Sequence, residues 1–63
     1  MKASEIRKMT TEQRFELLEK LRRELIILKS KAKRGTLKQT AKIRQIRKDL
    51  ARLLTVMREY GEI

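Results

Sequence analysis

The chain has 63 residues, with 18 Lys and Arg against 8 Asp and Glu, and a net charge of +10 at neutral pH. It contains no Cys, His or Pro, which excludes disulfides, thiolate or imidazole metal sites and histidine-based acid–base catalysis. A charge this skewed indicates an acidic partner, with nucleic acid as the first candidate and an anionic membrane surface as the second.

The first predicted element is a short helix over residues 4–8. Ser4 is its expected N-cap, and Glu5 falls in the first turn, where a carboxylate suits the helix dipole. A helix this short is not stable alone, so we expect it to pack against the rest of the chain.

A long helix is predicted over residues 10–34. Thr10 and Gln13 have the spacing of a capping box. Apolar residues then recur at spacings of three and four, which is the a/d pattern of a coiled coil. The seam residues are Leu18, Leu21, Leu25, Leu28 and Ala32. Gly35 follows a run of basic residues and supplies the left-handed position that commonly ends a helix.

A second long helix is predicted over residues 37–60, with Thr36 as its cap and Gly61 closing it. Its seam residues are Ile43, Ile46, Leu50, Leu53, Met57 and Tyr60. Two long helices joined by a short turn are expected to pack antiparallel. The predicted fold class is therefore all-α, with residues 1–63 forming one domain. That domain is an antiparallel, coiled-coil-like two-helix hairpin with the short helix packed at one end.

Four further apolar residues lie beside the first long seam: Phe15, Leu17, Ile26 and Ile27. They cannot all face one partner helix. Some are expected to cover the short helix, and others either contact a second protein or are scattered on the surface.

The positive charge is concentrated in one part of the chain. Residues 29–52 carry ten basic side chains and one acidic one, Asp49, whereas residues 1–24 carry a net +2 and residues 53–63 a net −1. On a helix, Arg44, Lys48 and Arg52 form one stripe opposite the seam. The predicted RNA-contacting residues form a basic tip and a basic flank: Lys31, Lys33, Arg34 and Lys38, then Arg44, Arg47, Lys48 and Arg52.

These residue types favour binding to the backbone of a folded RNA. Lys and Arg bind phosphates, while one Phe and one Tyr leave little scope for reading bases by stacking. No DNA-reading motif, glycine-rich phosphate loop or paired catalytic carboxylate occurs, so we predict neither an enzyme nor a cofactor or metal site.

The chain resembles a known family over essentially its whole length. Residues 35–38 followed by residues 43–55, together with residues 1–7 and 10–13, resemble the universal large-subunit ribosomal protein number twenty-nine family, in its bacterial form. Residues 47–52, Arg-Lys-Asp-Leu-Ala-Arg, are the most specific part of the match.

The resemblance implies a structural, non-catalytic protein of the large ribosomal subunit, located on the ribosome in the cytoplasm. It implies contact with large-subunit ribosomal RNA near the nascent-chain exit tunnel. It also implies a neighbouring protein, number twenty-three of the same subunit, and a region where chaperones and targeting factors dock. Neither a membrane nor a small-molecule substrate is expected.

Residue by residue, Arg47, Lys48 and Arg52 match basic positions of that family, and Ala51 matches a small one. Asp49 matches an acid that we assign to an intramolecular pair. One departure is Leu54, where many members have a basic residue, which puts a contact at that position in question.

Two other function classes remain open from the residues alone. The seam and the charge would also suit a free-standing basic coiled-coil interaction module or a nucleoid-type DNA binder. A basic amphipathic membrane binder is the third possibility, although no apolar run approaches the ~20 residues of a membrane span and MKASEIRKM lacks the apolar stretch of a signal peptide.

Overall fold

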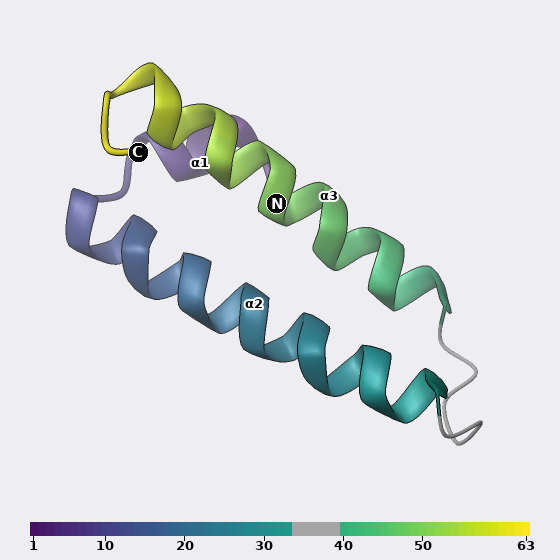
Figure 1. The fold of residues 1–63 in the computed structure, drawn as a ribbon. Coiled ribbons are helices and arrows are strands. Elements are labelled where there is room, and N and C mark those ends of the chain that lie inside the picture. The colour runs from purple at the N-terminus through teal and green to yellow at the C-terminus, as the bar shows by residue number, and fades with distance from the viewer. Residues whose placement is uncertain (34–39) are drawn as a thin grey trace.

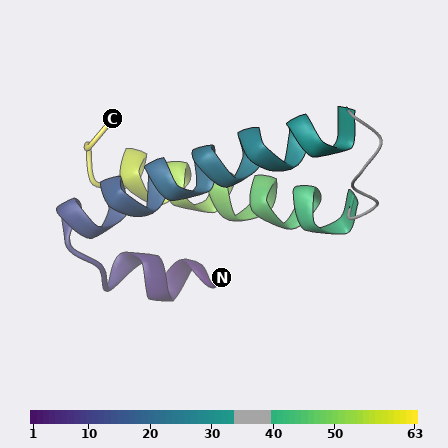
Figure 2. The same cartoon turned by 90° about the horizontal axis from the view of Figure 1, so that it is seen from below.

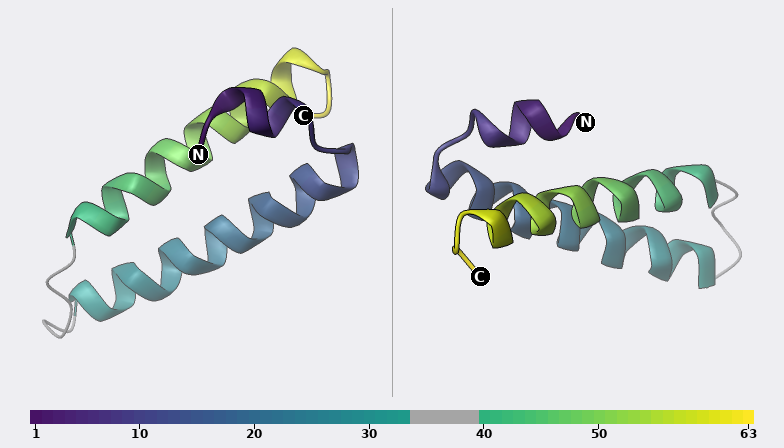
Figure 3. Two further views of the ribbon diagram at one scale, coloured as in Figure 1. Left: turned by 180° about the vertical axis from the view of Figure 1, so that it is seen from behind. Right: turned by 90° about the horizontal axis from the view of Figure 1, so that it is seen from above.

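The computed structural model describes residues 1–33 and 40–63. These form three helices, α1 (Ala3–Arg7), α2 (Thr11–Lys33) and α3 (Thr40–Glu59), with no strand in either described range. Figure 1 shows α2 and α3 side by side and antiparallel. Figures 2 and 3 show α1 on one side of that pair, where it packs against α3. The predicted all-α hairpin with a short helix at one end is confirmed.

The start of α1 differs from the prediction. The helix begins at Ala3, and the residue before it is Lys2, whose side chain makes no capping hydrogen bond, so Ser4 is not the N-cap. Ala3 and Ile6, one turn apart, both pack on the core, and Ile6 is fully buried. Docking of these two side chains therefore sets where α1 begins, and a capping side chain does not.

The start of α2 follows the predicted capping box. The Gln13 backbone N–H donates to Thr10 Oγ1 at 3.1 Å, and the Thr10 backbone N–H donates to Gln13 Oε1 at 3.0 Å. Two backbone donors that lack a partner inside the helix are thus satisfied reciprocally. The predicted ending at Gly35, the cap at Thr36 and the helical start at residue 37 lie outside the described residues.

We expect Thr10→Ala to lower the free energy of unfolding by about 1 kcal/mol, because the N-terminal turn of α2 loses its side-chain acceptor. In a domain of this size that corresponds to a melting temperature about 4–8 °C lower. Thermal unfolding followed by circular dichroism measures the shift. Thr55→Ala is the control, since the Thr55 hydroxyl bonds a carbonyl within α3, and equal shifts for the two variants would contradict a specific capping role.

The core forms along the predicted seam, with two exceptions on α3. Leu18, Leu21 and Leu28 of α2 and Ile46, Leu53 and Met57 of α3 are buried, and Leu25, Ile43 and Leu50 pack partly buried against them. Tyr60 was predicted in the seam but is 52% exposed, whereas Val56, outside the seam, is buried.

Val56 is buried because α3 has two neighbours. On the same stripe of α3, Arg52 donates to the Met1 carbonyl and Glu59 accepts from Arg7, so this side of α3 faces the N-terminal segment. Val56 lies between them at helical spacing. A seam calculated for one partner helix therefore misses it.

The end of α3 is closed at Gly61, as predicted. Gly61 has φ +67°, its N–H donates to the Arg58 carbonyl at 3.1 Å, and the Glu62 N–H donates to the Met57 carbonyl at 2.8 Å. These two bonds are those of a Schellman motif, which requires a left-handed residue at this position. The turn directs Glu62 back toward the start of α2.

Glu62 meets a buried arginine that the sequence did not single out. Arg14 is 6% exposed, and its Nε donates to Glu62 at 2.6 Å. Arg14 Nη1 also donates to the carbonyls of Ile6 and Met9, and the guanidinium lies 4.7 Å from the centroid of the Tyr60 ring. We call this set the Arg14 cluster. It joins the α1–α2 connection, α2 and the residues after α3.

The Arg14 cluster predicts an acid-sensitive contribution to stability. The hydrogen bond from Arg14 holds the pKa of Glu62 below its ordinary value of 4.5. A carboxyl whose pKa is depressed in the folded state contributes stability that is present above that ordinary value and is lost as the pH falls through the folded pKa. Glu62→Gln should therefore lower the melting temperature at pH 7 and change it little once the pH has fallen below the lowered pKa of Glu62 in the folded state.

The measurement is melting temperature against pH for the wild type and Glu62→Gln. Glu16→Gln is the matched control, because Glu16 is exposed on α2 and forms no ion pair within the described residues. A constant difference between wild type and Glu62→Gln at all pH values would show that the charge of Glu62 does not matter.

Candidate nucleic-acid interface

Six of the eight predicted RNA-contacting residues lie in the described part of the chain, and all six are exposed. Arg34 and Lys38 lie outside it. The six residues do not form a single cluster, because Lys31 and Lys33 are in the last turn of α2 and the other four are on α3: Arg44, Arg47, Lys48 and Arg52.

Three of the α3 residues form what we call the basic face: Arg44, Arg47 and Lys48. Ile43 and Ile46 pack on the core, so helical geometry turns Arg44 and Lys48 away from α2 and places Arg47 to the side, near the edge of the seam. Within residues 1–33 and 40–63, none of the three takes part in an ion pair. Their like charges at helical spacing disfavour the free helix slightly, and a bound polyanion would relieve that repulsion.

Arg52 was predicted to continue this stripe, but it is partly engaged elsewhere. Its Nη1 donates to the Met1 carbonyl at 3.0 Å and lies 3.8 Å from Asp49. Its side chain nevertheless remains 48% exposed. Arg52 therefore marks the boundary between the basic face and the N-terminal segment.

Asp49 forms the intramolecular pair expected of it. Its carboxylate accepts a hydrogen bond from Gln45 Nε2 at 3.1 Å and lies 3.7 Å from the Met1 amine. The side chain is 14% exposed. The single acid of residues 29–52 is thus turned toward the N-terminal segment, and the basic face stays uncompensated.

The hairpin end is the end at which the last turn of α2 lies beside the first turn of α3. There the structure adds a residue that the sequence analysis did not select. Lys42, in the first turn of α3, lines a pocket of about 270 Å³ together with Lys31, Glu24, Ile27 and Leu28 of α2. Lys42 was overlooked because it lies off the Arg44–Lys48–Arg52 stripe. Its position beside the seam, one residue before Ile43, is the signal that could have found it.

The outer surface of α2 has a different character. Acidic and basic residues alternate there, and Glu19 pairs with Arg23 at 3.4 Å. Of the four extra apolar residues, Leu17 packs against the core, whereas Phe15, Ile26 and Ile27 are 42%, 67% and 54% exposed. The basic residues predicted to contact RNA therefore lie on α3 and at the hairpin end, and the exposed apolar side chains Phe15, Ile26 and Ile27 lie on α2.

This surface is suited to binding anions. Guanidinium and ammonium groups presented without acidic partners attract phosphates over a distance and hold them by charge-assisted hydrogen bonds. In the part of the chain that the structure describes, no three acidic side chains gather as metal ligands. None of the helices described is long and apolar enough to span a membrane.

Comparison with known proteins identifies the family. The sequence model of the ribosomal L29 protein family matches residues 4–59. The chain belongs to the ribosomal L29 protein family. The large ribosomal subunit protein uL29 of Staphylothermus marinus is 58% identical over 59 residues, which cover 94% of this chain and 88% of that protein.

Other members of the ribosomal L29 family are similar over the same length. The uL29 proteins of Saccharolobus solfataricus and Geobacillus stearothermophilus are 51% and 46% identical, covering 94% of this chain and 81% and 89% of their own. The family resemblance is confirmed. Because archaeal and bacterial relatives both match, the comparisons do not single out the bacterial form.

Proposed function

We propose that this chain is a structural, non-catalytic constituent of the large ribosomal subunit, located on the ribosome in the cytoplasm near the nascent-chain exit tunnel. It binds large-subunit ribosomal RNA through the basic face and the hairpin end. Family membership over residues 4–59 supports the assignment, and the names of the relatives, as large ribosomal subunit proteins, agree with it.

The observation that carries the RNA-binding proposal is the uncompensated basic face. Arg44, Arg47 and Lys48 are exposed and free of ion pairs within the described ranges, and their nearest acid in sequence, Asp49, points toward the N-terminal segment. A phosphate backbone is the partner that such a surface attracts most strongly, and the attraction weakens with salt.

Sedimentation tests the proposal directly. The native protein should travel with large subunits through a low-salt gradient and be released as salt is raised. Crosslinking within intact subunits should then join α3 to ribosomal RNA. Sedimentation apart from large subunits at low salt would overturn the assignment.

We also propose that α2 provides the protein-facing side, toward ribosomal protein number twenty-three and toward chaperones or targeting factors at the exit site. The support is the exposure of Phe15 and Ile26, which helical spacing places on one side of α2. Because the chain has no cysteine, Ile26→Cys would carry a single crosslinker. It should capture a protein of the large subunit, and capture of RNA alone would contradict the proposal.

Competition separates this function from the free-standing coiled-coil module or nucleoid-type DNA binder. Excess random duplex DNA should not displace the protein from its own large-subunit RNA at matched salt. Equal retention by the two nucleic acids would favour the DNA binder. Family membership favours the ribosomal function.

A further inference from the structure

The interface between α2 and α3 has two edges, which carry different residues. In the heptad pattern of the seam, the residue directly after each d-position residue lies at one edge, and the residue directly before each a-position residue lies at the other. We call these the e edge and the g edge. In an antiparallel pair each edge is formed by the same heptad position of both helices, so the e residues of α2 face those of α3.

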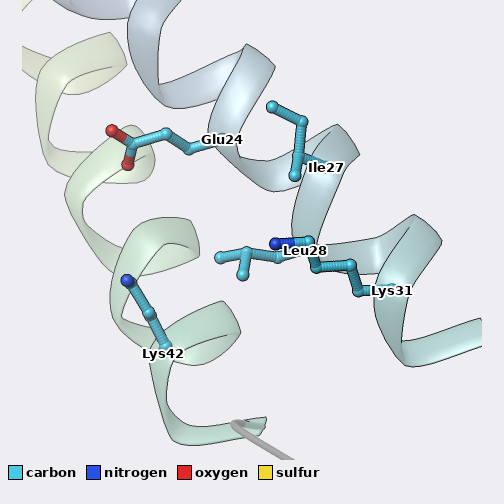
Figure 4. Close-up of a pocket in the computed structure, with 5 residues that line it drawn as sticks. All are labelled: Glu24, Ile27, Leu28, Lys31 and Lys42. Atoms are coloured by element: carbon cyan, nitrogen blue, oxygen red, sulfur yellow. The ribbon is translucent and has the colours of Figure 1, made fainter. Parts of the chain in front are cut away.

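The g edge carries acidic side chains and the N-terminal segment. Asp49 lies on this edge, 3.7 Å from the Met1 amine, and Val56 is buried there. Figures 2 and 3 show α1 on one side of the helix pair. Figure 4 shows Glu24 extending from α2 toward α3 on the same edge, where it shares a pocket with Lys42. Two carboxylates make this edge unfavourable for a phosphate.

The e edge carries two facing cations near the hairpin end. Among the described residues, Leu28 and Ile46 are the buried d-position residues closest to that end, and Leu28 lines a pocket with Lys42, one turn before Ile46. Leu28 and Ile46 therefore lie at one level of the interface. Lys29 and Arg47 directly follow them in sequence, which places these two residues opposite each other across the e edge.

Neither of these cations is compensated by an acid of its own helix. The residues one turn before and after Lys29 and Arg47 are all apolar or basic, and they include Lys33 on α2 and Arg44 on α3. Lys29 and Arg47 are both exposed, and within residues 1–33 and 40–63 neither takes part in an ion pair. The free hairpin thus holds like charges opposite each other at this level.

We propose that Lys29 and Arg47 together bind one backbone phosphate of large-subunit ribosomal RNA, with the RNA strand lying along the e edge. The guanidinium of Arg47 can donate to two phosphate oxygens, and the ammonium of Lys29 adds a point charge from the opposite helix. A phosphate between them offsets the repulsion that the free hairpin carries. This site rests on the proposed RNA-binding function and extends it to a residue of α2, outside the basic face.

The site borders the protein-facing side of α2 without using its apolar residues. Ile26 lies one turn before Lys29, and helical geometry points it further from α3 than Lys29. The next e residues along the hairpin are Arg22 of α2 and Leu54 of α3, and Leu54 packs against the core. Arg22 therefore has the helix, the heptad position and the exposure of Lys29, but it has an apolar residue opposite in place of a cation.

Substitution of Lys29 should change affinity and stability in opposite directions. Lys29→Gln should weaken binding of the full chain to its large-subunit RNA roughly four- to sixfold at 0.15 M salt, the loss for one phosphate contact. In the free protein at low salt it should raise the melting temperature by ~1–4 °C, because Arg47 and Lys33 lose a like-charged neighbour. Arg22→Gln is the matched control and should change both quantities less.

Photocrosslinking tests whether the two residues reach the same phosphate. The chain has no cysteine, so Lys29→Cys and Arg47→Cys can each carry one photoreactive probe in assembled large subunits. Probes at the two positions should mark the same or adjacent nucleotides, although they lie on different helices. A probe at Glu24→Cys, on the g edge of α2, should not mark those nucleotides.

The outcomes separate the site from the function on which it rests. If the wild type binds the RNA but Lys29→Gln loses no more affinity than Arg22→Gln, or lowers the melting temperature, the site is wrong and the function stands. Probes at positions 29 and 47 that mark distant RNA segments, or a probe at position 29 that marks only protein, would also overturn the site. If the wild type does not bind the RNA at all, the proposed function fails first.

Discussion

Leu53→Ala should remove most or all of the stability of the fold. Leu53 is fully buried between α3 and its neighbours, and truncating such a leucine costs about 2–5 kcal/mol through lost burial and a residual cavity. A domain of this length has a total stability of only about 3–9 kcal/mol at the usual value per residue. We therefore expect the variant to be largely unfolded at 37 °C, or to melt at a much lower temperature.

Urea and thermal unfolding followed by circular dichroism measure this effect. Ile26→Ala is the matched control, because Ile26 is 67% exposed on α2 and surface changes typically alter stability by no more than ~0.5 kcal/mol. Similar losses for the two variants would mean that Leu53 does not anchor the core.

Replacing the whole basic face should have the largest effect on RNA binding. The triple variant with Arg44, Arg47 and Lys48 changed to Ala removes three exposed cations that lack ion pairs within the described residues. Each lost phosphate contact reduces the slope of log affinity against log salt by about 0.7–0.9, so the slope should fall by about 2–3. At 0.15 M salt the affinity should drop on the order of a hundredfold.

A charge-matched control makes this result interpretable. Changing Lys8, Lys20 and Arg22 to Ala removes the same number of exposed cations from α2 and the α1–α2 connection, and it should reduce affinity much less. Circular dichroism should show unchanged helicity in both variants. If both triple variants lost affinity equally, net charge alone would account for binding, and the basic face would contribute no more than other exposed cations.

The parts of the fold that the sequence predicted correctly are those set by local rules. The Thr10 capping box, the left-handed Gly61 and the heptad spacing each depend on residues within a few positions of one another, so their pattern is visible in the chain. The pairing of α2 with α3 follows from two seams of similar length and a short connection.

The errors in the predicted fold lie at the end of the hairpin where the N-terminal segment docks. Ser4 was taken as a cap and Tyr60 as a core residue, and Val56 and Arg14 were overlooked. Each depends on where α1 docks, which is set by contacts between residues far apart in sequence and has no local signal. A buried arginine in particular cannot be told from an exposed one by its neighbours in the chain.

The candidate site was predicted in outline for a similar reason. Counting charges located the basic segment, and helical spacing grouped Arg44 with Lys48. Neither could show that Arg52 bonds the Met1 carbonyl or that Lys42 faces Lys31 across a pocket. These arrangements depend on the second helix and on α1, so they became visible only in three dimensions.

The Arg14 cluster also has a consequence for the order in which the molecule folds. Arg14 and Glu62 are 48 residues apart, so their contact closes most of the chain into one loop and carries a larger entropic cost than any contact within the hairpin. Local helical contacts form quickly, whereas distant ones form late. A newly made chain can therefore pack α2 against α3 first, and the Arg14 cluster, which fixes the α1–α2 connection, is completed only after residues 60–62 have been synthesised.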